Sequence, residues 1–226
     1  MDLFSNFIEL FFPRLCIACT NPLFVHESNL CNLCLYHLPR TNFEKDVNNP
    51  VAQLFWGRVN IEYATSYFFY NKGSRYQRIL HQLKYQGKKE IGFEIGKIFG
   101  KEIMNSDFSQ IQLIVPIPLH PSRLRQRGYN QAEWIAMGIA EAMGKPLENK
   151  TVARVSASST QTKKGRYDRW TNVDGIFRTC LPEKLINKHI LLVDDVVTTG
   201  ATLEACASAI LSLGNTKVSV ATLAVA

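Results

Sequence analysis

The chain has 226 residues, of which 46% are hydrophobic and 20% are charged, and its formal net charge is +7. This composition fits a soluble globular protein with one substantial α/β core and a small appendage. No apolar run reaches the roughly 18 residues that a membrane-spanning helix needs, so we expect no membrane span.

The N-terminal segment, residues 1–15, superficially resembles a secretion signal. It lacks a basic start and a small-residue cleavage site, so we expect a cytoplasmic protein. The segment instead predicts an amphipathic helix that packs on the protein, with contact to a membrane surface as the alternative. Its apolar positions are Leu3, Phe4, Phe7, Ile8 and Phe11.

Four cysteines follow in two pairs with CxxC spacing, Cys16 with Cys19 and Cys31 with Cys34. Two such pairs can present four thiolates in the tetrahedral arrangement of structural zinc sites. Disulfides are the alternative interpretation, although the missing secretion signal disfavours them. We therefore expect a small N-terminal zinc module with a structural Zn²⁺ ion.

Beyond the cysteines, strand and helix patterns alternate. A Pro- and Asn-containing connection at 39–50 marks a domain boundary, with the zinc module over 1–48 and a second domain over 49–226. Strands are predicted at 62–70, 111–117, 190–193 and 217–225, and helices at 74–84, 90–104 and 201–211, with a further helix ending at Met143. This alternation predicts an α/β fold with a mainly parallel twisted sheet flanked by helices.

A basic window without acids spans residues 72–89, with tyrosines interleaved. Cations can follow a phosphate backbone while aromatic rings stack on bases, so the window suits single-stranded nucleic acid. A solvated basic helix face is the alternative. The candidate nucleic-acid residues are Arg75, Tyr76, Arg78, Lys84, Lys88 and Lys89.

Three arginines follow the predicted strand 111–117, which ends in two closely spaced prolines. We expect Arg123, Arg125 and Arg127 in a loop at the edge of the sheet. Guanidinium groups pair bidentately with phosphate oxygens, so three of them suit a diphosphate. Exposed arginines that serve only solubility are the alternative.

A run rich in Ser, Thr and Lys lies between Arg154 and Arg178. One interpretation is a mobile loop that closes over a reacting centre, in which Lys163, Lys164 or Arg166 stabilises departing pyrophosphate. A surface loop without a catalytic role is the other.

The segment 189–202 joins a buried strand to two adjacent carboxylates, Asp194 and Asp195, and then to a loop rich in Thr and Gly. This loop and the start of the next helix can present backbone amides to a phosphate, with Gly200 providing backbone freedom. Two acids beside a phosphate must hold something neutral or cationic, such as sugar hydroxyls or a hydrated Mg²⁺. Acids that merely cap the helix are the alternative.

This segment resembles the phosphoribosyl pyrophosphate (PRPP) signature of type I phosphoribosyltransferases. The resemblance implies that Asp194 and Asp195 hold ribose hydroxyls, that the arginine segment binds pyrophosphate, and that Mg²⁺ accompanies PRPP. Asp194, Asp195 and Arg127 are the candidate catalytic residues. The candidate ligand-binding residues are the two acids with Arg123, Arg125, Thr198, Thr199, Gly200, Ala201 and Thr202.

Three further features are similar to the ComF family of competence-associated phosphoribosyltransferase-like proteins. They are the run 127–132, the double CxxC, and the segment 161–173, in which Arg169 and Asn172 fit the family pattern. The resemblance implies an accessory protein of natural transformation that binds PRPP or a related sugar phosphate, contacts single-stranded DNA and works with a DNA-import helicase. The alternative is an active phosphoribosyltransferase that transfers phosphoribose from PRPP to a base or amine acceptor.

Overall fold

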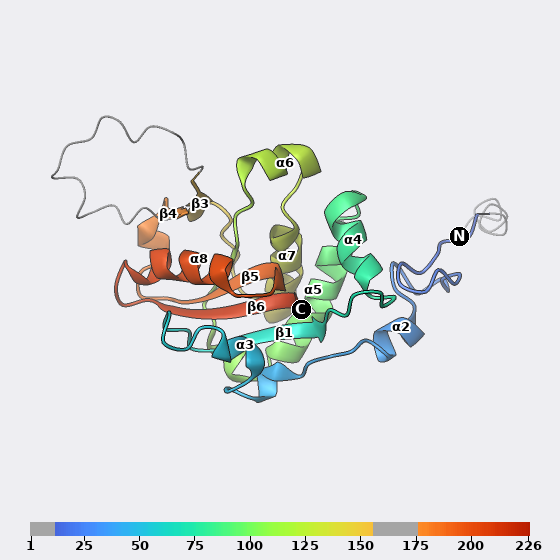
Figure 1. Ribbon diagram of the computed structural model, residues 1–226, viewed down its shortest axis with the longest axis horizontal. Helices are drawn as coiled ribbons and strands as arrows, with labels where there is room; N and C mark the ends of the chain where they lie inside the picture. Colours follow the sequence, from blue (N-terminus) through green and yellow to red (C-terminus); the bar gives the residue numbers. More distant parts are fainter. Residues whose placement is uncertain (1–11, 156–175) are drawn as a thin grey trace.

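The computed structural model describes residues 12–155 and 176–226 (Figure 1). Four parallel strands form one sheet in the order β1-β6-β5-β2. Their bounds are Ala64–Phe69 for β1, Leu113–Pro116 for β2, His189–Val197 for β5 and Lys217–Val225 for β6. The predicted α/β fold with a mainly parallel sheet is therefore confirmed.

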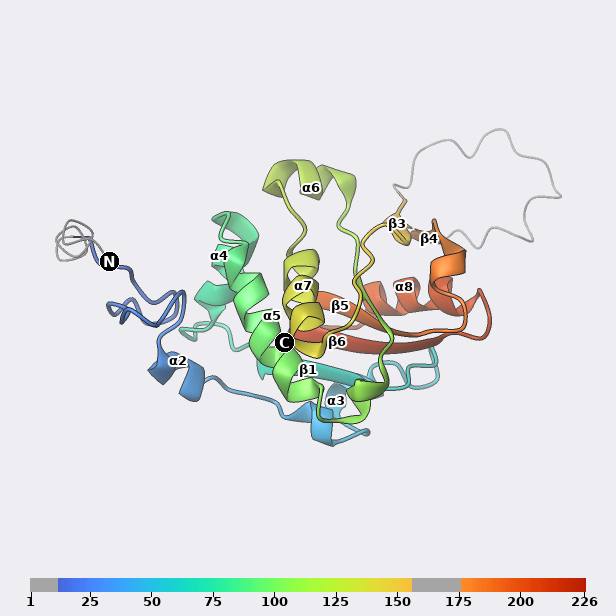
Figure 2. The same cartoon turned by 180° about the vertical axis from the view of Figure 1, so that it is seen from behind.

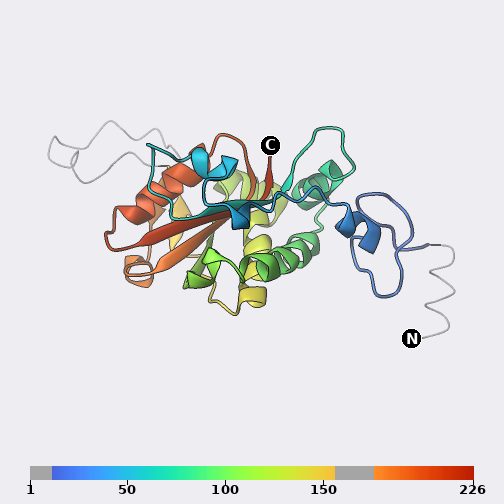
Figure 3. The same cartoon turned by 90° about the horizontal axis from the view of Figure 1, so that it is seen from below.

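The central strands are apolar because helices cover both faces of the sheet. In β5, Leu191 and Val193 belong to one hydrophobic core, and Ile190 and Leu192 belong to the other. Helices α5 (Glu90–Ile103) and α7 (Gln131–Met143) lie on the first face, and α8 (Ala201–Leu211) lies on the second (Figure 3). This sandwich explains the continuous apolar runs in the strands.

Helices α5 and α7 approach each other so closely that glycine is required at their crossing. A Cβ atom added at Gly138 would lie 2.1 Å from the carbonyl oxygen of Phe93, and one added at Gly96 would lie 2.3 Å from that of Ile135. Because neither backbone can retreat from the other, any side chain at these positions would force the helices apart.

The remaining elements are short, and most of them are helical. They comprise α2 (Asn32–Tyr36), α3 (Pro50–Gln53), α4 (Gln77–Tyr85), α6 (Pro121–Arg127) and the 3₁₀ turns Phe43–Lys45, Asp107–Gln110 and Pro182–Lys184. An antiparallel pair, β3 (Val152–Arg154) with β4 (Phe177–Thr179), flanks the interval 156–175. The helix expected near the N-terminus and the segment 161–173, with Lys163, Lys164, Arg166, Arg169 and Asn172, lie outside the described residues.

Helix α6 corrects the expectation of an arginine loop after the second strand. The His120 side chain accepts a hydrogen bond from the backbone N–H of Ser122, Pro121 occupies the first helical position, and Gly128 ends the helix at φ +79°. Helix α6 lies at the top of the molecule in both views, above α7 and the sheet (Figures 1 and 2).

The cysteine segment packs against the body of the protein through α4. Cys16, Cys34 and Tyr76 belong to the same buried cluster as the apolar face of that helix. The following segment pairs with the edge of β1, where the Phe69 amide donates to the Pro39 carbonyl at 2.9 Å. Among the residues described by the structure, no helix is both long enough and apolar enough to cross a membrane.

Candidate functional site

The two adjacent acids lie inside β5 rather than after it. The strand continues to Val197, which still pairs with Val225 of β6. Since successive side chains of a strand point to opposite faces, Asp195 takes the face covered by α5 and α7, whereas Asp194 takes the face of α8. The expectation that the strand ends before both acids is therefore wrong, and the pleat separates the two carboxylates.

The surroundings of Asp194 change its pKa. Burial and the nearby charge of Asp195 raise the pKa of Asp194 to about 7, against opposing effects of a hydrogen bond from the Asp195 amide and of the Lys84 and Arg154 charges. That amide donates to Oδ1 of Asp194 at 2.8 Å. A carboxyl group with this pKa can exist in either protonation state near neutral pH, which suits contact with a neutral hydroxyl group.

Asp195 has a cationic partner from a distant part of the chain. Its Oδ2 atom lies 3.0 Å from Nζ of Lys84, near the end of α4, and the two side chains are only 15% and 24% exposed. A ligand hydroxyl that bonds to Asp195 must therefore share this carboxylate with Lys84 or displace the ammonium group.

The loop after β5 has the features of a phosphate cradle. Gly200 adopts φ +76° as the N-cap of α8 and has no side chain that could cap the helix. The Thr199 hydroxyl accepts a weak hydrogen bond from the Ala201 amide at 3.5 Å, and no side chain caps the amides of Thr202 and Leu203. Thr198 and Thr199 are exposed beside Gly200. Uncapped amides at a helix N-terminus attract anions, so the loop 198–202 can bind a phosphate group.

Arg58 holds this loop in place through hydrogen bonds and an ion pair, and no sequence motif indicated this role. Its guanidinium donates to the Thr199 carbonyl at 3.1 Å and to the Leu54 carbonyl at 3.0 Å, and it pairs with the Glu204 carboxylate in α8. By engaging the Thr199 carbonyl, Arg58 fixes the loop on the side away from its free amides. Arg58 lies between α3 and β1, where spacing alone gives no signal.

Of the three arginines expected to bind diphosphate, Arg127 is the most constrained. Its guanidinium lies 5.4 Å from the centre of the Tyr85 ring and donates to Oε1 of Gln131 at 3.0 Å. Arg123 and Arg125 are exposed on α6. Arg127 therefore connects α6 to the end of α4 that also carries the partner of Asp195.

The residues after Arg127 hold the site together rather than facing a ligand. The Tyr129 hydroxyl donates to the Leu83 carbonyl in α4, and Nδ2 of Asn130 donates to the Ile117 carbonyl after β2 at 2.9 Å. The Asn130 side chain also accepts from the Ala132 amide and so caps α7. This part of the family motif fixes α6 and α7 relative to α4 and the sheet.

The four N-terminal cysteines converge on one point. Their sulfur atoms all lie within 4.8 Å of one another, and those of Cys19 and Cys31 are 3.7 Å apart. A tetrahedron with Zn–S bonds of about 2.3 Å has edges of about 3.8 Å, whereas a disulfide needs about 2.05 Å. The cluster thus has the geometry to hold a metal ion such as zinc, and all six cysteines of the chain are free thiols in the structure.

Backbone amides donate hydrogen bonds to sulfur atoms of this cluster. The amides of Cys31 and Cys34 each donate to a cysteine sulfur at 3.4 Å. Burial by itself would raise the pKa of Cys16, but hydrogen bonds from the backbone of Cys19, Cys31 and Ala18 lower it to about 7. A thiolate is the form that binds metal, so these amides favour coordination.

The predicted nucleic-acid window does not form one continuous face. Tyr76 is buried and its hydroxyl donates to the Cys34 carbonyl at 3.2 Å, so the expectation that its ring stacks on bases is wrong. Lys84 pairs with Asp195, and Nζ of Lys89 lies 4.7 Å from the centre of the Trp134 ring. The window also contains exposed cations, Arg75, Arg78 and Lys88.

Comparison with known proteins identifies a domain match in the part of the chain that carries the acid pair. A model of the phosphoribosyl transferase domain matches residues 130–225, which include the acid pair and the phosphate loop. Among solved structures, the glutamine PRPP amidotransferase from B. subtilis complexed with ADP and GMP aligns with a TM-score of 0.44 and 18% identity, over 59% of this chain and 26% of that chain.

Relatives with assigned names extend the match toward the N-terminus. DNA utilization protein YhgH of Salmonella typhimurium is 29% identical over 228 aligned positions, covering 92% of this chain and 95% of that protein. Competence protein ComFC of Bacillus subtilis is 29% identical over 64% of this chain and 57% of its own length, and Competence protein F of Haemophilus influenzae is 33% identical over 46% and 45%. The chain is therefore a ComF-family protein with a phosphoribosyltransferase-like domain.

Proposed function

We propose that this protein is a cytoplasmic accessory factor of natural transformation that binds PRPP, or a related sugar phosphate, together with Mg²⁺. In this role it also binds single-stranded DNA and cooperates with a DNA-import helicase. The observation that carries the ligand proposal is the glycine N-cap of α8, Gly200 at φ +76°, which follows the acid pair of β5 in a loop rich in threonine. The names of the competence and DNA utilization relatives support the biological role.

Different parts of the site bind the charged and the neutral groups of the ligand. The amides and hydroxyls of the loop 198–202 bind the 5-phosphate, and the carboxylates of Asp194 and Asp195 accept hydrogen bonds from ribose hydroxyls. Arg123, Arg125 and Arg127 of α6 face the pyrophosphate. Mg²⁺ bound with the ligand neutralises part of the pyrophosphate charge.

Calorimetry with PRPP and MgCl₂ tests this assignment. Asp195→Asn removes one charged acceptor, and a hydrogen bond to a charged group is worth about 1.5 to 3 kcal/mol, so affinity should fall about tenfold or more. Asp107→Asn, at an exposed position in the 3₁₀ turn Asp107–Gln110, is the matched control and should bind like wild type. Equal affinity of wild type and Asp195→Asn would reject the role of Asp195.

Fluorescence anisotropy with a labelled oligonucleotide tests the nucleic-acid part. Each phosphate neutralised on a single strand contributes about 0.7 to the slope of log affinity against log salt. Removing the charges of Arg75, Arg78, Lys88 and Lys89 should therefore flatten this slope. A wild-type protein that does not bind at low salt would remove single-stranded DNA from the proposed function.

An active phosphoribosyltransferase is the second candidate function. The combination of the acid pair and the loop 198–202 supports it. Pyrophosphate release from PRPP, measured with bases, amines and single-stranded DNA as acceptors, separates the two roles. Release that depends on one acceptor establishes an enzyme, whereas binding without release supports the accessory role.

A further inference from the structure

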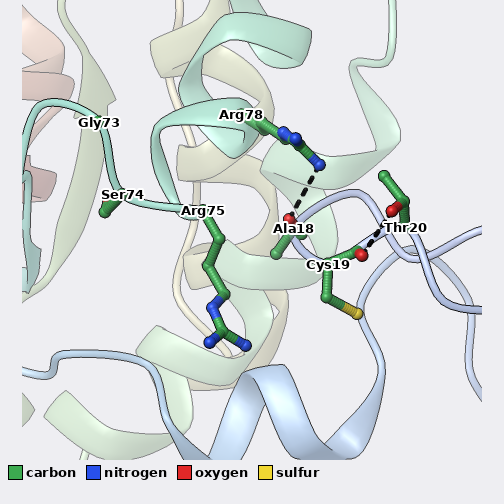
Figure 4. Close-up of a pocket in the computed structure, with 7 residues that line it drawn as sticks. All are labelled: Ala18, Cys19, Thr20, Gly73, Ser74, Arg75 and Arg78. Carbon is green, nitrogen blue, oxygen red and sulfur yellow. Dashed lines mark hydrogen bonds between the residues drawn. The ribbon is translucent and has the colours of Figure 1, made fainter.

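A second candidate site lies between the cysteine module and the start of α4, on residues that the sugar-phosphate site does not use. A cavity of about 470 Å³ opens there (Figure 4). It is lined on one side by residues 18–20, here called the knuckle, and on the other by the turn 73–75 and Arg78. Volumes of this order are typical of small-molecule sites.

The lining of this cavity is cationic. Arg75 and Arg78 contribute two guanidinium groups, no carboxylate lines the cavity, and Cys19 of the metal cluster forms part of its wall. Arg78 is fixed in place because it donates to the Ala18 carbonyl in the knuckle at 3.4 Å (Figure 4). Arg75 is exposed, and its guanidinium group makes no hydrogen bond or ion pair within the described parts of the chain, so its fork of donors is available to a ligand.

A hydroxyl group without a partner adds a second kind of donor. The Oγ atom of Ser74 is buried and has no hydrogen-bond partner among the described residues, although Ser74 lines the cavity. The Thr20 hydroxyl, on the other side of the cavity, already donates to the Cys19 carbonyl at 2.5 Å (Figure 4). A buried hydroxyl without a partner is costly, so rotation of the Ser74 side chain toward a ligand oxygen in the cavity would be favoured.

We propose that this pocket binds the phosphate group of a nucleotide, with Arg75 as the direct donor and Arg78 as a cation held in place by its bond to the Ala18 carbonyl. Planar guanidinium groups recognise phosphate by paired hydrogen bonds, and a lining without acids suits an anion. The phosphate belongs either to a nucleic-acid strand or to a free mononucleotide. The first source rests on the proposed binding of single-stranded DNA, and the second is independent of it.

The experiment uses the full chain with its metal content measured for every variant. Labelled oligothymidylate and thymidine 5′-monophosphate are the probes, and thymidine, which lacks the phosphate, is the ligand control. We expect Arg75→Gln to weaken binding of at least one probe about tenfold, and Ser74→Ala to weaken it less. Lys150→Gln removes one exposed charge next to β3 and should leave both affinities unchanged.

The outcomes separate the sources and the alternatives. Loss of oligonucleotide binding alone assigns the pocket to a strand, and loss of mononucleotide binding assigns it to a free nucleotide. Unchanged affinity for both probes in Arg75→Gln overturns the proposal. So does a variant that loses its metal while keeping affinity, since Arg75 would then serve as a countercharge to the thiolates. If wild type binds only the mononucleotide, the pocket stands and the DNA-binding proposal fails.

Discussion

Lys84 and Asp195 form an ion pair between the C-terminal end of α4 and strand β5, with Nζ and Oδ2 3.0 Å apart. Helix α4 also carries Arg78, which reaches the cysteine knuckle. One short helix thus contacts both the candidate metal cluster and the candidate sugar site. A shift of α4 would therefore alter both the metal cluster and the sugar site.

The first prediction concerns the strength of this pair. Lys84→Gln should lower the free energy of unfolding, and it should lower it less in the Asp195→Asn background than in wild type. Contacting residues couple by about 0.5 to 3 kcal/mol, and the partial exposure of both side chains places this pair at the lower end. Urea unfolding of the four proteins measures the coupling, and strictly additive losses would contradict the pair.

The second prediction follows from the raised pKa of Asp194. Because this pKa moves from 3.8 to about 7 on folding, the cost of the carboxylate to stability is absent below about pH 3.8, grows as the pH rises and is complete above about pH 7. Asp194→Asn removes this cost, so the variant should be more stable than wild type at pH 8. The difference should shrink at pH 5.

Urea midpoints of wild type and Asp194→Asn, compared at each pH, provide the measurement. Effects of pH on other groups are shared by the two proteins and cancel in the comparison. A gap of the same size at both pH values would show that the substitution acts through packing rather than ionisation.

The third prediction concerns the metal. Purified protein should contain about one Zn²⁺ per chain, and Cys16→Ser should lose it and loosen the segment that packs on α4, because structural zinc contributes folding energy. Metal analysis and hydrogen exchange of residues 16–34 measure both effects. Cys180→Ser, at an exposed thiol outside the cluster, is the control and should retain zinc. A folded, metal-free protein with two disulfides would contradict the site.

The fourth prediction concerns the crossing of α5 and α7. In most helices Gly→Ala stabilises by roughly 0.5 to 1 kcal/mol, but at Gly138 the new methyl group would lie 2.1 Å from the Phe93 carbonyl oxygen. We therefore expect Gly138→Ala to destabilise the protein by about 1 to 3 kcal/mol. Thermal unfolding is the measurement, with Ser208→Ala on the exposed side of α8 as control. A rise in stability would contradict the close approach.

Regular elements with strong local signals could be predicted from the sequence. The strand at 217–225 and the helix at 201–211 have the predicted bounds, because buried apolar runs and a glycine before the helix are local features. Both ends of α6 also had local signals, which are Pro121 at the start and Gly128 at the end. The expectation of a loop rested on the three arginines between these two residues.

Contacts between distant residues could not be predicted from spacing. The burial of Tyr76 depends on the Cys34 carbonyl, and the role of Arg58 depends on the Thr199 carbonyl. Nothing in the basic window distinguishes Lys84, which has a carboxylate partner, from Lys88, which is exposed. These roles are set by which elements the sheet topology brings together.

The pairing of β1 with β6 has a consequence for synthesis of the protein. Ala64 pairs with Val220, so a strand made early finds its neighbour in the sheet only much later. At about 5 to 20 residues per second on the ribosome, this delay is on the order of ten seconds or more. During that time β1 exposes unpaired backbone groups that can join a strand of another chain. The nascent protein is thus most prone to aggregation before β6 emerges, and chaperones that cover β1 in this interval would raise its yield.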